Sequence, residues 1–431
     1  MSLKPNVTKD LCRLATVKHL IDLTSPYWAF IAERPVYLAL SGGKDSVVLL
    51  DALMQQWPTN AAYPLTILHV NHHLQASSSS WAEHCVALAT RYGLICSVMD
   101  VSVAATGNIE ANAREARYRA LFSGMAHNGV LLLGQHANDQ VETLLLNLKR
   151  GAGSQGLTGM PAWQTQINRF GALPSMALFR PLLETTQAQI DSYAQETLEV
   201  SDWVEDPSNQ DIHYDRNFLR HEVISTLSQR WPQWINKVAQ SMQVLTQEHA
   251  LLLDATNEKL TSCLRGDELS LNELAHFSQP WQTQTLRLFA QRYAQVLLTQ
   301  AQLISLEQVI SAKSDAKGQL TVVNQLGQMV HFFRYQAHLY CVFQTTLDDA
   351  QIRFNQQVSR QFAQDENMSY QPVPLSYKIK LINARQHKPI KQCYQAWSIP
   401  PWWRPFTLIQ QHNSHDELLW CNGVEYKLSK D

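Results

Sequence analysis

The sequence predicts an α/β domain with a doubly wound parallel sheet, followed by a mainly helical middle domain and a small α+β carboxyl-terminal domain. Two observations predict the first domain: short apolar runs alternate with amphipathic ones, and each amphipathic run is long enough to cross back over a sheet. A change to long helical periodicity after about residue 220 predicts the second. We place the domains at 1–222, 223–345 and 375–431, with a linker at 346–374.

The elements of the first domain are expected in strict alternation. Strands are predicted at 36–40, 65–70, 94–101 and 130–134, and helices at 45–56, 80–91, 109–126 and 139–149. In the middle domain, Ile235, Val238 and Met242 recur at helical spacing and predict a long amphipathic helix. More helix is predicted at 283–297, and an antiparallel meander at 319–323, 328–334 and 338–342. The polar, glutamine-rich stretch 345–371 is predicted to be a linker.

Composition limits the class of protein. With 431 residues, 45% hydrophobic and 17% charged, the chain can form two or three cored domains and is too apolar to be disordered. Its net charge of −2 means that any nucleic-acid contact must come from local patches. The seven cysteines include no CxxC pair, which favours reduced thiols over a cysteine-bound metal site. Without an apolar leader or membrane span, a cytoplasmic protein is expected.

The first predicted strand ends in the hexapeptide SGGKDS (41–46), which leads directly into a helix. Open α/β sheets bind ligands at this end of their strands. Two glycines permit positive φ, so backbone N–H groups can converge on an anion, and the Ser41 and Ser46 hydroxyls add donors. Asp45 fits beside phosphates only if Mg²⁺ lies between them. The alternative is a polar-capped Gly-Gly turn without a ligand.

Other polar clusters each have a structural alternative. Asp139 and Glu142, in HANDQVET (136–143), also form a capping-box pattern. Arg114 and Arg117 lie one helical turn apart, which suits phosphates or base edges but is also typical of a solvated basic face. The three histidines of HVNHH (69–73) cannot all point one way from a strand, so a zinc site is not expected.

SGGKDS after a first strand resembles the PP-loop ATP pyrophosphatases, which cleave ATP between the α- and β-phosphates. Further stretches are similar to the tRNA(Ile)-lysidine synthetases, in order along the first 224 residues. They are HVNHHL (69–74), IEANAREARYRAL (109–121), GQHANDQVETLLLNLKRGAGSQGLTGM (134–160), RPLLE (180–184) and EDPSNQDIHYDRNFLRHEVI (205–224).

The resemblance implies a ligase that forms a carbon–nitrogen bond. Its members convert the wobble cytidine of a CAU-anticodon isoleucine tRNA to lysidine, using ATP, Mg²⁺ and free L-lysine. Cytosine C2 is a poor electrophile, because O2 would have to leave as oxide. Transfer of AMP to O2 with release of pyrophosphate makes it a good leaving group, which the lysine ε-amine then displaces. The product tRNA reads AUA instead of AUG and accepts isoleucine instead of methionine.

The same resemblance implies roles for individual residues. Catalysis is assigned to Asp45, Arg117 and Asp139; ATP binding to Ser41, Gly42, Gly43, Lys44, Asp45, Ser46 and His136; and metal binding to Asp45 and Asp139. Arg114, Glu142, Arg216, Asn217 and Arg220 are candidates for contact with tRNA or lysine. The sequence departs from the family's HxxDDxxET at Asn138, which removes one carboxylate, and Gln75 stands where many relatives carry a basic residue.

The segment 385–406 of the tail interleaves cations with aromatic residues. Lys388, Lys391 and Arg404 are predicted to contact tRNA phosphates, because this part resembles the family's carboxyl-terminal tRNA-binding domain. At least two of its rings (Tyr394, Trp397, Trp402, Trp403) are expected in a core instead. The middle domain is expected to place the tRNA. No membrane partner is expected, and a homodimer is left open.

Two other classes of enzyme and one of binding protein are less consistent with the sequence. A tRNA cytidine 2-thiolase would need paired cysteines. A PP-loop amidotransferase would bring a glutaminase domain or a glutaminase partner, and neither the middle nor the tail resembles such a domain. A non-catalytic tRNA-binding protein with an inactive ATP site would be expected to lack Asp45, Arg117 or Asp139, and all three are present.

Overall fold

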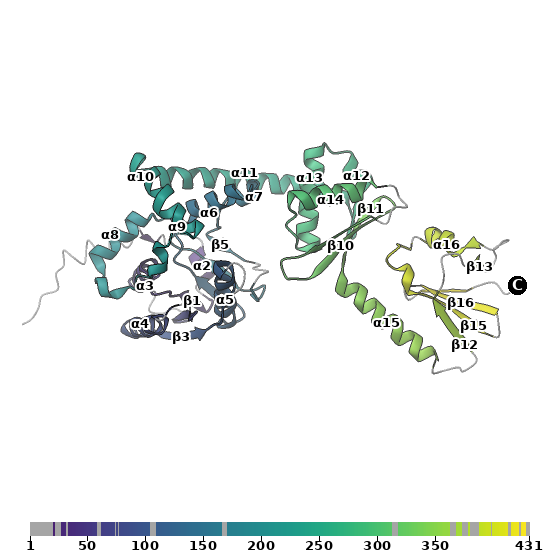
Figure 1. Cartoon of the computed structure of the whole chain (residues 1–431), viewed down its shortest axis with the longest axis horizontal. Helices are drawn as coiled ribbons and strands as arrows, with labels where there is room; N and C mark the ends of the chain where they lie inside the picture. Colours follow the sequence, from purple (N-terminus) through teal and green to yellow (C-terminus); the bar gives the residue numbers. More distant parts are fainter. Residues whose placement is uncertain are drawn as a thin grey trace, which may run out of the picture. The chain divides into compact units, whose positions relative to one another are not determined.

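The chain forms two compact units, 1–252 and 253–431, and each is described by itself (Figure 1). The computed structural model describes residues 20–21, 27–31, 33–57, 62–73, 75, 77–103, 109–165, 170–312, 318–362, 368–372, 378–379, 388–397, 399–412, 415–421 and 424–427. Among the described helices, none has the length and apolar character needed to cross a bilayer.

A six-stranded sheet of order β3-β2-β1-β4-β6-β5 organises the first unit. Its strands are β1 (Val36–Ala39), β2 (Leu65–Asn71), β3 (Ile95–Asp100), β4 (Val130–Leu132), β5 (Trp163–Gln164) and β6 (Ala177–Phe179). All neighbouring pairs are parallel except β5–β6. The predicted doubly wound sheet is confirmed, and its four predicted strands lie within two residues of the observed ones.

Helices cover both faces of this sheet (Figure 1). They are α2 (Tyr27–Ile31), α3 (Lys44–Met54), α4 (Ser78–Arg91), α5 (Ile109–Ser123), α6 (Ala137–Lys149), α7 (Ser154–Leu157) and α8 (Gln187–Thr197). Because side chains alternate along a strand, Val130 and Leu132 join one core with α3, α4 and α8, whereas Leu131 and Leu133 join another with α5.

A buried carboxylate fastens α3 to its neighbours. Asp51, 6% exposed, accepts hydrogen bonds from the Tyr92 and Tyr193 hydroxyls, both at 2.6 Å. Tyr92 follows α4 and Tyr193 belongs to α8, so one side chain joins three helices. Since a buried polar group costs little only when it is hydrogen-bonded, these contacts fix the carboxyl-terminal half of α3 against α4 and α8.

After α8 the chain leaves the sheet, and the segment that follows packs against α6. After 3₁₀ turns at Val200–Asp202 and Pro207–Gln210 come α9 (Asp215–Phe218), a π-helical turn (Leu219–Ile224), α10 (Ser225–Arg230) and α11 (Trp234–Cys263). Ile224 and Ile235 pack against Ala137 and Val141 of α6. The predicted long helix is therefore confirmed as α11.

The second unit begins with helices around a five-stranded antiparallel sheet of order β7-β8-β11-β10-β9. Its elements are β7 (Leu264–Arg265), β8 (Glu268–Ser270), α12 (Leu271–Ala275), α13 (Gln279–Phe289), a π turn (Ala290–Ala294), α14 (Gln300–Ser311), β9 (Gln319–Val323), β10 (Met329–Tyr335) and β11 (His338–Phe343). The predicted meander is confirmed as β9–β11; the short strands β7 and β8 were not predicted.

The segment predicted to be a linker instead contains regular structure. α15 (Gln344–Phe362) occupies most of it, and β12 (Met368–Pro372) pairs with β15 in the last sheet. A sequence rich in glutamine lacks a wide apolar face, yet glutamine, arginine and alanine are good helix formers, so polarity alone was a poor guide. The predicted domain boundaries stay predictions.

The carboxyl-terminal part is a small α+β arrangement, as predicted. A four-stranded antiparallel sheet has the order β12-β15-β16-β17. The strands β13 and β14 form a separate pair, and β14 leads directly into α16. The elements are β13 (Lys378–Ile379), β14 (Lys388–Pro389), α16 (Ile390–Ala396), a 3₁₀ turn (Arg404–Phe406), β15 (Thr407–His412), β16 (His415–Cys421) and β17 (Val424–Lys427).

Candidate functional site

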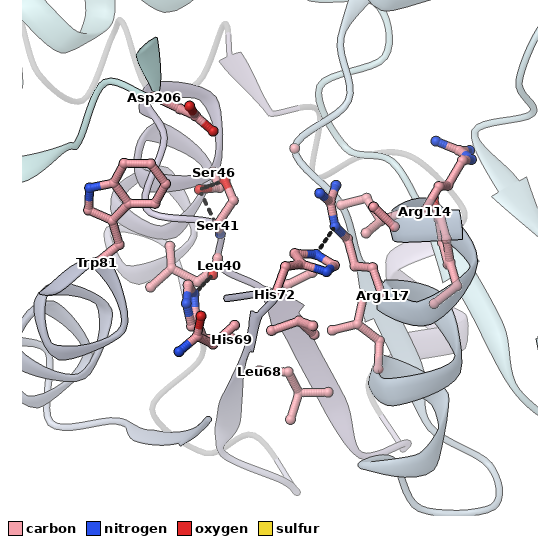
Figure 2. Close-up of a pocket in the computed structure, with 18 of the residues that line it drawn as sticks. Leu40, Ser41, Ser46, Leu68, His69, His72, Trp81, Arg114, Arg117 and Asp206 are labelled. Carbon is pink, nitrogen blue, oxygen red and sulfur yellow. Dashed lines mark hydrogen bonds between the residues drawn. The ribbon is translucent and has the colours of Figure 1, made fainter. Parts of the chain in front are cut away.

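A cavity of about 490 Å³ lies at the carboxyl ends of β1, β2 and β4 (Figure 2). This is the edge at which open α/β sheets bind ligands. The polar residues that line it are Ser41, Asp45, Ser46, His69, Asn71, His72, Gln75, Ser78, Arg114, Arg117, Gln135, Asp139, Asp206, Ser208 and Arg216, with Trp81 and Tyr118 among the aromatic ones. Strand ends, α4, α5 and the 206–216 segment thus converge on one space.

The first glycine of the turn before α3 has no room for a side chain. Gly42 has φ +85°, a left-handed conformation that favours glycine. A Cβ atom there would lie 3.0 Å from Val204 Cγ2 and 3.2 Å from Cys85 Sγ. Gly43 is extended and caps α3. The turn therefore brings the amino terminus of α3, with its partial positive charge, to the cavity.

The two serines of the turn are hydrogen-bonded to each other and to its backbone. Ser46 Oγ donates to the Gly43 carbonyl at 2.9 Å and accepts from the Ser41 N–H at 3.2 Å. The hydroxyls of Ser41 and Ser46 lie 3.1 Å apart, and both line the cavity (Figure 2). The turn is thus arranged before any ligand arrives.

Two carboxylates flank the ring of His136. Its Nδ1 accepts from the Asn138 N–H at 3.3 Å, which assigns the ring proton to Nε2. Nε2 lies 3.6 Å from Asp45 Oδ2 and 3.5 Å from Asp139 Oδ2, and it is buried without a hydrogen-bond partner among the described residues. Burial opposes charging, yet the two carboxylates raise the pKa of His136 above its ordinary value.

Asp45 is held ionised. Burial alone would raise its pKa, but the contact with His136 and a hydrogen bond from Gln187 lower it below the ordinary value. Gln187 Nε2 donates to Asp45 Oδ1 at 3.2 Å, and the Gln187 N–H is bound by Asn138 Oδ1 at 3.0 Å. The Asn138 amide therefore fastens the start of α8 beside Asp45.

The donor set near Asp45 suits a hydrated cation only in part. Among the described residues, no group of three His, Cys, Asp or Glu side chains is arranged to hold a metal ion by itself. Asp45 and Asp139 nevertheless approach the same His136 nitrogen from two sides. Mg²⁺ is commonly bound by one or two carboxylates together with water and substrate phosphates, and this pair fits that pattern.

Behind Asp139 lies a buried network of four charges. Glu142, fully buried, accepts from Arg216 Nε at 2.6 Å and from Arg220 Nε at 2.7 Å. The Nη2 atoms of both arginines lie 3.3–3.4 Å from Asp139 Oδ1. Burial disfavours the charged guanidiniums, but the two carboxylates raise the pKa of each. Arg216 and Asp139 also line the cavity, whereas Glu142 and Arg220 do not.

Two predicted site residues point elsewhere. Lys44 Nζ lies 3.0 Å from Asp191 Oδ1 on α8 and 5.5 Å from the ring centre of Trp203, and it does not line the cavity. The Asn217 amide donates to the carbonyls of Ser208 and Asp211, both at 2.9 Å. Asn217 therefore shapes the 206–216 segment from behind.

The opposite wall carries two arginines from α5. The Arg114 guanidinium lies 5.0 Å from the centre of the Tyr118 ring. Arg117 Nε donates to His72 Nε2 at 3.1 Å. Figure 2 shows the side chains of Arg117 and His72 facing each other in the cavity wall. The predicted pair of arginines thus lines the same cavity as the SGGKDS turn.

The histidines in β2 and directly after it point in different directions, as predicted. His69 Nδ1 donates to the Leu40 carbonyl at 2.8 Å, and His73 instead lies 2.7 Å from Asp100 Oδ1. The neighbouring Gln75 Nε2 donates to Asp206 Oδ1 at 2.6 Å. Gln75 therefore ties the loop after β2 to the 206–216 segment.

Several residues in the cavity lining or next to it had no role assigned from the sequence. Gln187 lies in no recognisable motif, and Trp81 and Tyr118 read as ordinary helix residues. Arg180 stood in the quoted RPLLE stretch; it is buried and donates to Gln135 Oε1 at 2.6 Å, which orients that cavity-lining amide. No periodicity distinguishes these residues from core or surface positions.

In the tail, aromatic packing and cations separate. Tyr394 is buried, and the Trp402 ring stacks on Phe333 of β10 with centroids 4.5 Å apart, so at least two rings belong to a core as predicted. Arg404 Nε donates to the Ile399 carbonyl at 3.1 Å, and its guanidinium lies over Tyr394. Lys388 and Lys391 are exposed. Arg385 lies outside the described residues.

A parallel α/β sheet with an SGGKDS turn at the carboxyl end of β1 places the chain among the PP-loop nucleotide-binding proteins. A model of the PP-loop domain matches residues 15–227, and a model described as the TilS substrate binding domain matches 269–340. The chain belongs to the tRNA(Ile)-lysidine synthase family.

Named relatives cover most of the chain. The chain is 35% identical over 415 residues to the tRNA(Ile)-lysidine synthase of Haemophilus ducreyi. The matched region covers 88% of this chain and 92% of that protein. The synthase of Pseudomonas aeruginosa is 42% identical over 232 residues, 54% of this chain and 50% of that protein. Among solved structures, the U34-tRNA thiolase NcsA from Methanococcus maripaludis has a TM-score of 0.43 at 13% identity, covering 56% of this chain and 79% of that one.

Proposed function

We propose that the protein joins free L-lysine to C2 of the wobble cytidine in a CAU-anticodon isoleucine tRNA, with ATP cleaved to AMP and pyrophosphate. One observation supports this most directly: the SGGKDS turn lines the same cavity as Arg114 and Arg117, neither of which forms an ion pair among the described residues. That combination suits transfer of AMP to an oxygen atom, because the reaction needs phosphates held on one side and developing charge stabilised on the other.

The turn and the start of α3 bind the pyrophosphate part of ATP in this proposal. Ser41, Gly42, Gly43 and Ser46 supply backbone N–H groups and hydroxyls, and Lys44 contributes charge from the side of α8. Asp45 and Asp139 would hold Mg²⁺, which when bound would neutralise phosphate charge and orient the α-phosphate. His136 separates the two carboxylates at the end of β4.

The arginines divide into two groups. Arg114 and Arg117 would contact the transferred nucleotide and the cytosine, since their guanidiniums line the cavity opposite the turn. Arg216 would face the tRNA or lysine from the third side. Both Glu142 oxygens already accept from arginines, so we assign Glu142 to holding Arg216 and Arg220 in place.

The direct test is the mass of the modified nucleoside. The protein is incubated with ATP, Mg²⁺, lysine and a CAU-anticodon isoleucine tRNA transcript, and the digested tRNA is examined for a cytidine that has gained one lysine and lost one water. A methionine tRNA transcript with the same anticodon, and a reaction without lysine, serve as controls. Absence of the adduct under conditions in which ATP is consumed would contradict the proposal.

We further expect the exposed lysines of the tail to bind tRNA phosphates. Replacing Lys388 and Lys391 with alanine should weaken tRNA binding at low salt and reduce the salt slope by up to about two units, because each phosphate contact contributes roughly one. The measurement is tRNA affinity as a function of salt. We leave Arg404 intact in this variant because its guanidinium packs on Tyr394.

An anticodon stem-loop provides the control for that variant. If the tail binds a distant part of the tRNA, the stem-loop should bind the variant and the unmodified protein equally well. Unchanged affinity and salt slope with full-length tRNA would show that these lysines are solvated charges without a phosphate partner.

A further inference from the structure

His72 lies in the cavity wall just after β2, and the site described so far gives it no role. Its Nε2 accepts the hydrogen bond from Arg117 Nε at 3.1 Å. Its Nδ1 is buried without a hydrogen-bond partner among the described residues. Since a neutral imidazole carries one proton, acceptance at Nε2 assigns that proton to Nδ1.

The ring can act as an acceptor only while it is neutral. Burial, followed by the positive charge of Arg117 and the neighbouring His69, lowers the pKa of His72 to about 4. The ring is therefore neutral at every pH at which the protein would work. A lysine or a protonated histidine at this place would instead repel the guanidinium.

Arg117 depends on this contact for its orientation. Among the described residues, no carboxylate forms an ion pair with Arg117, in contrast to Arg216 and Arg220. A guanidinium has five N–H donors in a rigid plane. When Nε is fixed by His72, the plane is fixed too, and the terminal nitrogens keep their donors for a ligand. Figure 2 shows the two side chains meeting in this way.

We propose that His72 is a positioning residue: its neutral ring holds the Arg117 guanidinium in the orientation that stabilises charge on the transferred nucleotide. This inference rests on the proposed function, which gives Arg117 its substrate. It also explains why a histidine of HVNHHL faces the cavity although, among the described residues, these histidines are not grouped as metal ligands. Catalytic contact belongs to Arg117, and His72 acts through it.

The test compares two replacements of similar size. His72→Gln keeps a neutral acceptor near the position of Nε2, whereas His72→Met removes it. We expect His72→Met to lower kcat about tenfold, as loss of one orienting hydrogen bond would, and His72→Gln to restore most of that loss. His73→Asn is the matched control: His73 is exposed, binds Asp100 and has φ +52°, which asparagine tolerates.

A double-mutant cycle shows whether His72 acts through Arg117. In an Arg117→Ala background, His72→Met should cause no further loss, because the group that it positions is gone. Equal losses in both backgrounds, or equal activity of the Gln and Met variants, would overturn the proposal. Failure of the unmodified protein to form lysidine would instead refute the proposed function.

A measurement that does not depend on activity tests the positioning role of His72 separately from the proposed function. In protein labelled with nitrogen-15 at histidine, the Nε2 resonance of His72 should have the shift of a hydrogen-bonded acceptor and should move on Arg117→Ala. The resonance of His73 should stay in place. An Nε2 resonance that ignores the loss of Arg117 would overturn the positioning role even if every variant were inactive.

Discussion

Asp45→Asn is expected to reduce lysidine formation by about 10²–10³-fold while the protein stays folded, because a carboxylate that holds a metal beside phosphates supplies several kcal/mol of charge stabilisation. The turn itself is set by Gly42 and by the serine hydrogen bonds, none of which involves the Asp45 side chain. The measurements are release of pyrophosphate and accumulation of adenylated tRNA, with the melting temperature as a check of folding.

Asp191→Asn is the matched control for this variant. Asp191 accepts from the same Gln187 amide at 3.2 Å, but it lies outside the cavity lining. It should therefore lose far less activity than Asp45→Asn. If adenylated tRNA accumulates at the normal rate in Asp45→Asn, then Asp45 is only a residue at the start of a helix and the proposed metal site is wrong.

Glu142→Gln should destabilise the protein by about 3 kcal/mol, because removing one partner of a buried ionic network leaves charge without compensation. Glu142 is fully buried between Arg216 and Arg220, which would then share the single carboxylate of Asp139. We expect the lower end of the range for such losses, since the two arginine side chains are 26% and 36% exposed. The measurement is the free energy of unfolding in denaturant.

The same change at an exposed ion pair gives the comparison. Glu115 pairs with Arg119 at 2.7 Å, one turn apart on α5, with both side chains more than half exposed. Glu115→Gln should cost no more than about 0.5 kcal/mol, because water screens such pairs. Similar losses for Glu142→Gln and Glu115→Gln would mean that the buried network does not stabilise the fold.

The sequence by itself determined the parts that depend on local pattern. The apolar run of β1 and the largely apolar run of β2 were recognised as strands, because a strand buried on both faces must be mostly apolar. The SGGKDS turn was placed correctly because its serine hydrogen bonds reach only two to five positions along the chain. The packing that requires glycine at position 42 comes instead from the distant Cys85 and Val204. Local polarity failed for α15, where good helix formers and a narrow apolar face, with Phe354 packed on Phe406, outweighed the high glutamine content.

Only the tertiary structure decided which side chains meet. Gln187 contacts Asp45 across 142 residues, and Lys44 turns to Asp191 instead of the cavity. Glu142 became the centre of a buried network because Arg216 and Arg220 return to it after more than 70 residues. Such pairings depend on how the chain crosses back over the sheet and on which groups burial excludes from water. Neither the path of the chain over the sheet nor the burial of a particular group can be predicted from the spacing of residues along one element.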